Sequence, residues 1–365
     1  MTQMLSQGKM NITIIVKGAG SMNLKKILAL ALVAAVLFTG CENRREETKQ
    51  ALENQKMENR HEATSFAMDT IMTFTVIHED GDQLIIDAEQ RIRELENLLS
   101  ITLENSEISR LNAAAGKEAV EVSKDTWILL EAGKNLGAGT GGAFDIAISP
   151  VVKAWGFTEA EHHVPTQAEL DALLPLTNPD DVVLENMTAF LEKEGMAVDL
   201  GGITKGYASD EVASLLKGKG VESAIVSLGG NVYGIGTKPN GDKWEVALAN
   251  PLDANDYCGL ISIEDKAVVT SGGYQRFFEE NGKKYHHIID PATGYPAETG
   301  LLSVTIISES GMEADVLSTA LFVMGLEDAL EYWQENGGFE AIFVTEAGEV
   351  VATEGADACF EFEGR

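Results

Sequence analysis

Residues 284–296 of this chain read KYHHIIDPATGYP, and residues 311–325, after an intervening β-like run, read GMEADVLSTALFVMG. The first segment predicts a strand that ends in a turn, because β-favouring residues run into an Asp-Pro step and a Thr-Gly step. The second segment predicts a helix. Ser310 followed by Glu313 has the spacing of a capping box, and Gly325 suits the position just beyond the last turn. This strand, turn and helix carry the polar side chains on which the interpretation depends.

The predicted helix places Asp315 and Thr319 on one face, because residues four apart in a helix lie above one another. A carboxylate and a hydroxyl in this arrangement suit a hard cation such as Mg²⁺, which prefers oxygen ligands, keeps several waters and often binds substrate phosphates. The alternative is structural: Asp315 caps a helix or forms a salt bridge, and Thr319 packs inward. The pair alone does not decide between these interpretations, so the upstream residues are needed.

The charge of the chain argues against two classes of function. Its 365 residues include 27 basic and 58 acidic side chains, which gives a net charge of −31. Residues 1–40 hold four lysines and no acidic residue, so the remainder carries a net charge of −35. Nucleic-acid binding needs a basic footprint, and electrostatic docking on anionic lipid needs a basic patch. We therefore expect no nucleic acid among the partners, and a membrane link must have another origin.

The first 40 residues have the layout of a signal peptide. A basic stretch at 22–26 precedes an apolar run at 27–38, which is too short to span a bilayer, and two small residues then precede Cys41. This order resembles a bacterial lipoprotein cleavage box with lipidation at Cys41; an ordinary secretory signal cut nearby is the alternative. We expect an exported protein, lipid-anchored to the outer face of the cytoplasmic membrane. Residues 1–21 do not fit a signal peptide, which makes Met22 a candidate initiator and leaves open whether 1–21 are translated.

Residues 41–62 are expected to form a lipidated cysteine and a polar tether, because this charged stretch has too few large apolar side chains to offset its ordering entropy. Residues 63–365 are expected to form the folded domain. Cys258 and Cys359 are too few for a disulfide scaffold. They can pair in an oxidising compartment, but we expect two unpaired thiols.

The order of the predicted elements favours an α+β fold with mixed sheets and flanking helices, because strands come in runs and do not alternate strictly with helices. Strands are expected at residues 64–78, 197–200, 223–228, 244–248, 267–270, 284–289, 302–307, 341–345 and 350–353. Helices are expected at residues 83–99, 105–111, 125–136, 204–216, 313–323 and 326–334.

Four glycine-marked segments precede the opening one: GGAFD, VDLGGITKGY, SLGGN and TSGGY, which begin at residues 141, 198, 227 and 270. Paired glycines let backbone groups approach a ligand closely, although each pair alone is more often a tight turn. A helix that starts at Thr204 after such a turn presents free N–H groups that favour phosphate. The glycines at 137–142 are not a dinucleotide-binding fingerprint, because they follow a predicted helix, and no Gly-Lys-Ser/Thr marks a P-loop.

In their longer forms, GGAFDIAISPVVKAWGF, VDLGGITKGYASD, SLGGNVYGIG, TSGGYQRFF, HHIIDPATGYP and EADVLSTALFVMG closely resemble the ApbE family of FAD:protein FMN transferases. The resemblance runs from about Ser65 to about Thr353, in family order. It implies that 63–365 form a single compact catalytic unit of the ApbE-like type. It also implies Mg²⁺-dependent transfer of the FMN moiety of FAD to a Thr or Ser hydroxyl through a phosphodiester bond, with release of AMP. The implied partners are FAD and acceptor flavoprotein subunits with an exported Thr or Ser site.

The resemblance also implies roles for single residues. The implied metal ligands are the Gly202 carbonyl and the side chains of Asp315 and Thr319. The family's usual aromatic flavin-side residue is absent near Thr102, and Lys205 stands where some relatives carry an acidic residue. The implied cofactor-binding positions are Met68, Thr102, Ala143, Phe144, Asp145, Asp199, Lys205, His287 and Ile289.

Elementary chemistry agrees with these roles, and His287 and Asp315 are the expected catalytic residues. Transfer of FMN out of a pyrophosphate is phosphoryl transfer, in which catalysis is mostly positioning and charge neutralisation. Mg²⁺ would supply that neutralisation. His287, with an ordinary pKa near ~6.5, would take the proton of the acceptor hydroxyl; hydrogen bonding to substrate without proton transfer is the alternative. Asp290 is the next candidate base, and His286, on the opposite side of a strand, is expected to face solvent or to be structural.

Two other functions use the same residues differently. A metal-dependent FAD pyrophosphatase would use water as nucleophile and give FMN and AMP. A non-catalytic flavin-binding lipoprotein would need no pairing of Asp315 with Thr319, so their joint presence counts against it. An acceptor groove leaves no short motif, so the sequence separates the transferase poorly from the pyrophosphatase and does not identify the acceptor or the oligomeric state.

Overall fold

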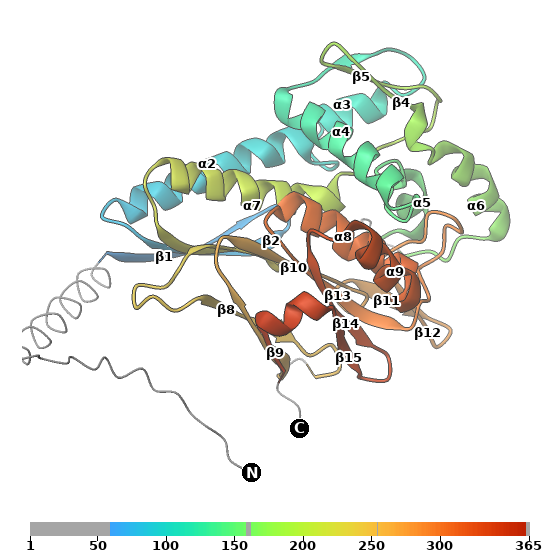
Figure 1. Cartoon of the computed structure of the whole chain (residues 1–365). Coiled ribbons are helices and arrows are strands. Elements are labelled where there is room, and N and C mark those ends of the chain that lie inside the picture. The colour runs from blue at the N-terminus through green and yellow to red at the C-terminus, as the bar shows by residue number, and fades with distance from the viewer. Residues whose placement is uncertain (1–58, 158–161, 254, 363–365) are drawn as a thin grey trace, which may run out of the picture. The chain divides into compact units, whose positions relative to one another are not determined.

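An eight-stranded antiparallel sheet forms the centre of the protein (Figure 1). The structure is a computed structural model that describes residues 59–157, 162–253 and 255–362. The strand order is β1-β2-β6-β7-β10-β13-β14-β15, and every neighbouring pair is antiparallel. The strands are β1 (Arg60–Ala67), β2 (Thr70–Ile77), β6 (Ser223–Leu228), β7 (Asn231–Gly236), β10 (Lys266–Gly272), β13 (Leu301–Ser308), β14 (Glu340–Thr345) and β15 (Val350–Ala352).

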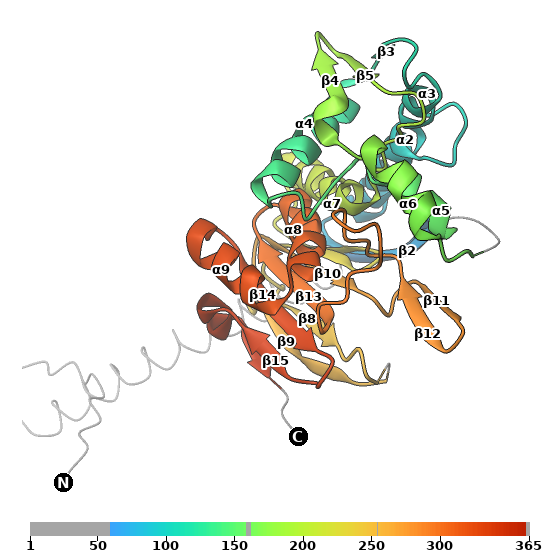
Figure 2. The same cartoon turned by 90° about the vertical axis from the view of Figure 1, so that its right-hand side faces the viewer.

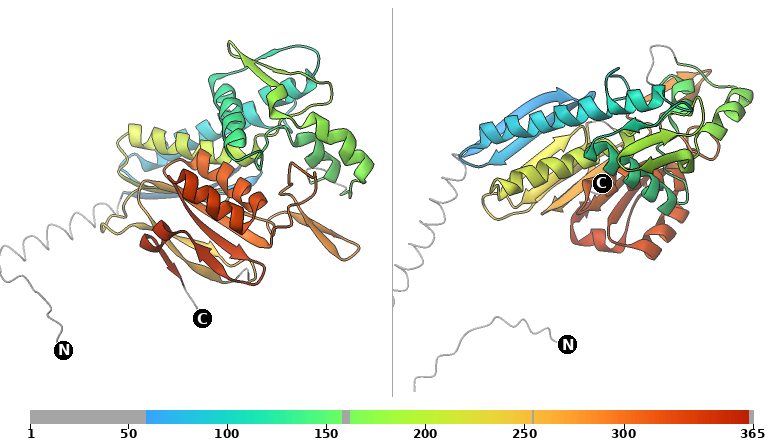
Figure 3. Two further views of the ribbon diagram at one scale, coloured as in Figure 1. Left: turned by 45° about the vertical axis from the view of Figure 1, so that its right-hand side comes forward. Right: turned by 90° about the horizontal axis from the view of Figure 1, so that it is seen from above.

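The two faces of this sheet are covered differently. Three long helices, α2 (Gly81–Leu99), α7 (Gly201–Gly218) and α8 (Gly311–Met324), lie along one face (Figures 1 and 3). A small antiparallel sheet packs on the other face; it consists of β8 (Trp244–Ala249), β9 (Tyr257–Ile263) and β16 (Phe360–Phe362).

The side chains of β10 show how one strand serves both cores. Ala267 and Val269 belong to the helix-side core, and Val268 between them packs with the residues of the small sheet. Successive side chains of a strand point to opposite faces, so a strand buried on both faces needs apolar residues at every position. The continuous apolar runs of the central strands follow from this double burial.

The remaining elements surround one end of this layered core (Figure 2). The helices α5 and α6 lie near the hairpin formed by β11 and β12, and buried aromatic side chains connect them. These elements are α3 (Glu107–Ala113), β3 (Val120–Glu121), α4 (Lys124–Gly139), α5 (Ser149–Trp155), α6 (Gln167–Leu173), β4 (Val182–Glu185), β5 (Thr188–Leu191), β11 (Phe277–Glu280) and β12 (Lys283–His286). The helix α9 (Leu326–Asn336) packs instead beside α8 and β14.

The structure confirms the α+β class. Every pairing between its named strands is antiparallel, whereas mixed sheets were expected. The helix at 311–324 begins as predicted, because the Ser310 side chain accepts a hydrogen bond from the Glu313 N–H at 3.2 Å. The first strand takes in residues 60–62, which were expected to belong to the tether. Residues 1–40 and Cys41 lie outside the described residues.

Two predicted strands are wrong. The strand expected at 64–78 is a hairpin, β1 and β2, whose turn residues Met68 and Asp69 both have positive φ. Such a two-residue turn usually has glycine at its second position after asparagine, aspartate or glycine, so the Met68-Asp69 pair does not signal it. The strand expected at 197–200 is an extended segment outside any sheet. Its backbone is satisfied in another way: Val198 exchanges two hydrogen bonds with the Asn112 side chain, at 2.8 and 2.9 Å.

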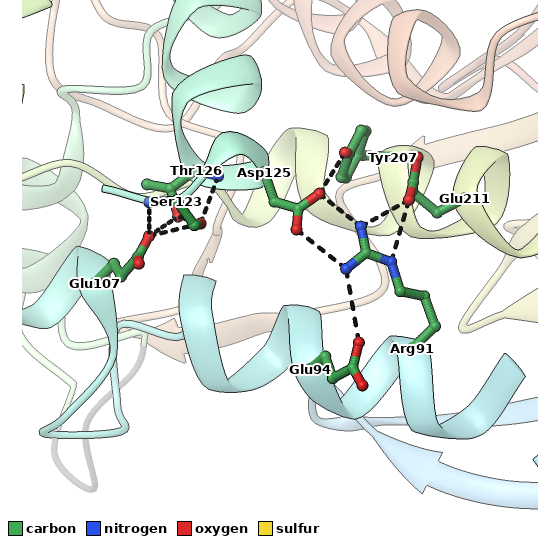
Figure 4. A network of polar contacts seen from close by, with 8 residues as sticks. All are labelled: Arg91, Glu94, Glu107, Ser123, Asp125, Thr126, Tyr207 and Glu211. Carbon is green, nitrogen blue, oxygen red and sulfur yellow. Dashed lines mark hydrogen bonds and ion pairs between the residues drawn. The ribbon is translucent and has the colours of Figure 1, made fainter. Parts of the chain in front are cut away.

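A network of charges joins α2, α4 and α7 (Figure 4). The Arg91 guanidinium lies 2.6 Å from Asp125 and 2.7 Å from Glu211, and the Tyr207 hydroxyl donates to Asp125 at 2.7 Å. Burial alone would raise the pKa of Asp125, but the hydrogen bonds from Arg91 and Tyr207 outweigh it and lower that pKa. The network therefore fixes α7 laterally against its two helical neighbours.

Cys258 is buried, Cys359 is half-buried, and both are free thiols. Within the described part of the chain, no helix is both long and apolar enough to cross a bilayer.

Candidate active site

The helices α7 and α8 pack closely against each other at Gly206. A Cβ added to Gly206 would lie 2.1 Å from the Gly311 carbonyl oxygen and 2.7 Å from Asp315 Cβ. Real Cβ atoms do not come so near a backbone atom, so only glycine permits this contact. The helices run antiparallel, and Asp210, one turn further along α7, accepts hydrogen bonds from the Gly311 and Met312 N–H groups at the start of α8.

This approach brings together the three residues expected to bind a metal. Asp315 is 4% exposed, and its Oδ2 accepts the Gly206 N–H at 2.9 Å. A regular helix directs that N–H at the Gly202 carbonyl, four residues back, so Asp315 competes with Gly202 for this donor. Thr319 lies one turn from Asp315, and a Cβ built on Gly202 would lie 3.9 Å from Thr319 Oγ1. The residues that would supply the carboxylate, hydroxyl and carbonyl oxygens thus lie on the facing sides of the two helices.

The adjoining strand holds Thr319 in place. The Ser271 hydroxyl, near the end of β10, lies 3.2 Å from Thr319 Oγ1 and 2.8 Å from Ser318 Oγ. Thr319 is half-buried, so its side chain does not lie fully within the core, and the assignment of Asp315 and Thr319 as metal ligands stays a prediction.

Replacing Gly206 with alanine should therefore lower the free energy of unfolding by about 1–3 kcal/mol, the usual cost of overpacking. The added methyl meets a backbone oxygen that cannot rotate away. The matched control is Gly218→Ala at the end of the same helix, where an added Cβ would meet nothing within 4 Å. Urea denaturation followed by circular dichroism measures both variants, and equal effects would contradict the close approach.

The AFD segment lies beside the start of α7. A Cβ on Gly202 would lie 2.9 Å from Phe144 Cε2, so the aromatic ring covers the first turn of the helix. Asp145 is buried, its Oδ1 accepts the Ala147 N–H at 2.7 Å, and burial raises its pKa to about 6. Ala143, half-buried, precedes this ring at the end of the turn after α4. The predicted cofactor residues Ala143, Phe144 and Asp145 therefore adjoin the predicted metal ligands.

Asp199 lies just before α7 and accepts the Gly201 N–H at 2.8 Å. Desolvation raises the pKa of Asp199, and the positive charges of Lys205 and Arg276 oppose that rise. The Lys205 ammonium donates to the Gly201 carbonyl at 3.3 Å. Two cations thus lie within electrostatic reach of the Asp199 carboxylate.

His287 is held by a single carbonyl. Its backbone N–H and its Nδ1 both approach the Arg276 carbonyl oxygen, at 3.2 and 3.1 Å. A carbonyl only accepts, so Nδ1 carries the proton and Nε2 carries the lone pair. Desolvation, reinforced by the charges of Arg276, His286 and Lys205, lowers the pKa of His287 to about 4. The ring is a neutral imidazole whose Nε2 has no partner among the described residues.

The neighbouring candidates have structural roles. His286 approaches the Ala297 carbonyl through Nε2 at 3.0 Å and packs edge-on against Phe322, as expected for the opposite side of a strand. Asp290 uses both carboxylate oxygens in its own turn, accepting from the Ala292 N–H and the Thr293 hydroxyl. Asp290 is therefore a poor alternative to His287 as a base.

The β1–β2 turn completes the site, and Arg276 is a residue that the sequence did not single out. The Met68 N–H donates to Glu96 of α2 at 2.6 Å, which fixes the turn. Asp69 next to it lies 3.3 Å from the Arg276 guanidinium. Arg276 lies in the motif TSGGYQRFF, three residues after the glycine pair. No spacing rule assigns a role to an arginine at that position, so the sequence alone does not identify it.

Two predicted cofactor residues are not joined to the others. Thr102 is exposed, and its hydroxyl pairs with Ser100 at 2.9 Å. The Ile289 side chain is buried in the aromatic cluster around Trp155. Among the described residues, no hydrogen bond or ion pair connects either side chain with the expected metal ligands, with Asp199 or with His287.

The pKa of His287 gives a direct check of this geometry. The imidazole signal should titrate with a midpoint near pH 4, well below the ordinary value of about 6.5 for an exposed histidine. The pKa of His287 is lowered because desolvation and the nearby cations both disfavour the charged ring. Histidine NMR of the protein without FAD measures the midpoint, and His287→Asn assigns the signal. A midpoint near 6.5, or a ring with the proton on Nε2, would contradict the buried site.

Solved structures share this α+β fold. In this chain, two of its helices pack closely at a glycine and bury a carboxylate where they cross. A crystal structure of the ApbE protein of Thermotoga maritima superposes with a TM-score of 0.77 at 32% identity, covering 84% of this chain and 100% of that one. The flavin transferase ApbE of Vibrio cholerae gives 0.75 at 30% identity, covering 82% and 99%.

Sequence relatives agree. An FAD:protein FMN transferase of Klebsiella pneumoniae (strain 342) is 38% identical over 265 residues, which cover 72% of this chain and 82% of the relative. One of Treponema pallidum (strain Nichols) is 36% identical over 270 residues, 69% and 74% of the two chains. The model of the ApbE family matches residues 68–343. The chain belongs to the ApbE family.

Proposed function

We propose that this chain is an enzyme, an FAD:protein FMN transferase, which moves the FMN moiety of FAD to a Thr or Ser hydroxyl of an acceptor protein and releases AMP. The proposal depends on how three kinds of side chain are arranged in a protein of this family. A neutral histidine with a free Nε2 lies near the cations Arg276 and Lys205, and Lys205 belongs to α7, the helix that also carries the expected metal ligand Gly202. FAD is the substrate, and the acceptors are flavoprotein subunits with an exported Thr or Ser.

The residues present divide the chemistry between them. The acceptor oxygen attacks the phosphorus of the FMN half, a new P–O bond forms, and the P–O bond to the AMP phosphate breaks. His287 Nε2 takes the hydroxyl proton, which the tautomer fixed by the Arg276 carbonyl allows. Lys205 and Arg276 face the anionic pyrophosphate. AMP leaves with the electron pair of the broken bond.

The oxygen cluster at the helix crossing fits Mg²⁺. The Gly202 carbonyl and the side chains of Asp315 and Thr319 would hold it, and a site with a single carboxylate suits an ion that keeps several waters and binds substrate phosphates. When bound, the ion would neutralise charge on the phosphate oxygens. Asp315 Oδ2 already accepts from Gly206, so the second oxygen of this carboxylate is the one available to a ligand.

The test of this function separates it from its alternatives. The purified protein is incubated with FAD, MgCl₂ and an apo acceptor protein of the Vibrio cholerae relative, and intact mass and AMP are measured. We expect the acceptor to gain the mass of FMN with one AMP released per transfer. AMP and free FMN formed equally well without acceptor would identify an FAD pyrophosphatase. FAD bound but unchanged would identify a non-catalytic flavin-binding protein.

Asp315→Ala should lower transfer by about 10²-fold or more, because the change removes the only carboxylate among the expected ligands. It should also weaken the dependence of FAD binding on Mg²⁺. Asp315→Asn, which keeps an acceptor for the Gly206 N–H, distinguishes loss of the charge from loss of packing. Asp328→Ala, an exposed aspartate on α9, is the control. Transfer like that of the unchanged protein at limiting Mg²⁺ would reject the metal assignment.

The location is part of the proposal: the protein is exported and lipid-anchored through Cys41 to the outer face of the cytoplasmic membrane. Supporting it are the basic, apolar and small-residue order before Cys41 and the net charge of −31, which disfavours electrostatic docking on anionic lipid. An acceptor would then be modified on the same side of the membrane.

Cys41→Ala should move the protein from the membrane to the soluble exported fraction, because the lipid is the attachment. Cell fractionation with immunoblotting measures this, and Cys258→Ala is the control for loss of a cysteine. A Cys41→Ala protein that stays with the membrane would reject the anchor.

A further inference from the structure

Exposed apolar side chains gather on both sides of one ion pair. Among the described residues, nine large hydrophobic side chains are exposed, and three of them are Phe66, Ile71 and Phe277. Phe66 and Ile71 flank the turn that carries Asp69, and Phe277 follows Arg276. The ion pair between Asp69 and Arg276 therefore has apolar side chains on both of the hairpins that it joins.

The two side chains on the first hairpin form a cross-strand pair. Phe66 on β1 lies opposite Ile71 on β2, and they are 62% and 64% exposed. Their neighbours Ala67 and Met72 face the core on the other side of the sheet. The alternation of a strand therefore turns Phe66 and Ile71 outward. Neither the helices nor the small sheet covers them.

Phe277 is held outward in the same way. Its neighbour Phe278 is buried against Trp155 and Tyr285, which anchors the β11–β12 hairpin to the body of the protein. Phe277 on the opposite face is 44% exposed, and the Lys284 ammonium lies 3.7 Å from its ring centroid. Figures 2 and 3 show this hairpin projecting from the body.

The ion pair connects these side chains to the reacting position. The carbonyl of Arg276 accepts both hydrogen bonds of His287, so the residue that joins the hairpins also orients the candidate base. An acceptor hydroxyl must come within hydrogen-bond distance of His287 Nε2. The chain on either side of that hydroxyl advances only about 3.3 Å per residue, so its next few side chains must lie near the two hairpins.

We propose that Phe66, Ile71 and Phe277 form the docking surface for the acceptor protein, whose segment around the modified Thr or Ser presents apolar side chains to them. This inference rests on the proposed function and names the partner surface of the same site. Exposed apolar patches with a polar rim mark interaction surfaces, and here the Asp69–Arg276 ion pair and the Lys284 ammonium supply polar groups beside the apolar side chains.

The test uses the double variant Phe66→Thr with Ile71→Thr, the single variant Phe277→Thr, and Phe362→Thr as control. Threonine keeps the preference for a strand while removing the apolar surface. Phe362 is 60% exposed on β16, an edge strand of the small sheet that contributes no residue to the candidate site. The full chain is assayed with FAD, MgCl₂ and the apo acceptor protein of the Vibrio cholerae relative.

We expect the KM for the acceptor to rise by roughly 5-fold or more in the double variant and in Phe277→Thr, the scale of a residue that contributes to binding. The kcat at saturating acceptor and the Kd for FAD should stay within about 2-fold, and Phe362→Thr should match the unchanged protein. An unchanged KM in both test variants overturns the docking surface while transfer by the unchanged protein still supports the proposed function. No transfer by the unchanged protein overturns both.

Two further outcomes would also overturn the inference. A fall in kcat without a change in KM would assign these side chains to the geometry of the site. Light scattering that shows a dimer of the unchanged protein, and a monomer of the variants, would assign the surface to a second copy of this chain.

Discussion

The close approach of α7 and α8 at Gly206 is the constraint on which the candidate site depends. With any side chain at that position, the Gly311 carbonyl and Asp315 would have to move. The same approach lets Asp210 satisfy the first N–H groups of α8 and lets Asp315 accept the Gly206 N–H. Because the two helices run antiparallel, Gly202 and Thr319 meet one turn away.

A second group of contacts depends on Arg276. Its carbonyl fixes the tautomer of His287, and its side chain reaches Asp69 in the β1–β2 turn. Met68 and Asp69 hold positive φ without being glycine, which is a strained backbone that the Glu96 contact secures. The candidate base and the β1–β2 turn are thus positioned by the loops at one end of the sheet, and the expected metal ligands by the helices above it.

The sequence predicts the helix face and the family motifs better than the loops between them. Asp315 and Thr319 follow from a spacing of four, and the Ser310 cap follows from residue type, because both are local properties. The hairpin at Met68 could not be predicted, since its turn pairs methionine with aspartate and lacks the glycine that usually marks a two-residue turn. The segment at 197–200 has strand composition, yet Asn112, distant in sequence, satisfies its backbone. Arg276 orients His287 through its backbone carbonyl. Every residue type has a backbone carbonyl, so the residue type gives no sign of this role.

The charges of the site explain how a weak base can suit this reaction. In the free protein, desolvation and the positive charges of Arg276 and Lys205 lower the pKa of His287 to about 4. Burial also raises the pKa of Asp145 and of Asp199, and the hydrogen bond from Gly201 and the charges of Lys205 and Arg276 oppose the rise at Asp199. A pyrophosphate bound beside the two cations would cancel part of the field that acts on His287. Because nearby negative charge favours the protonated ring, FAD would raise the pKa of His287 and make Nε2 a stronger base in the complex in which the acceptor hydroxyl attacks the phosphorus.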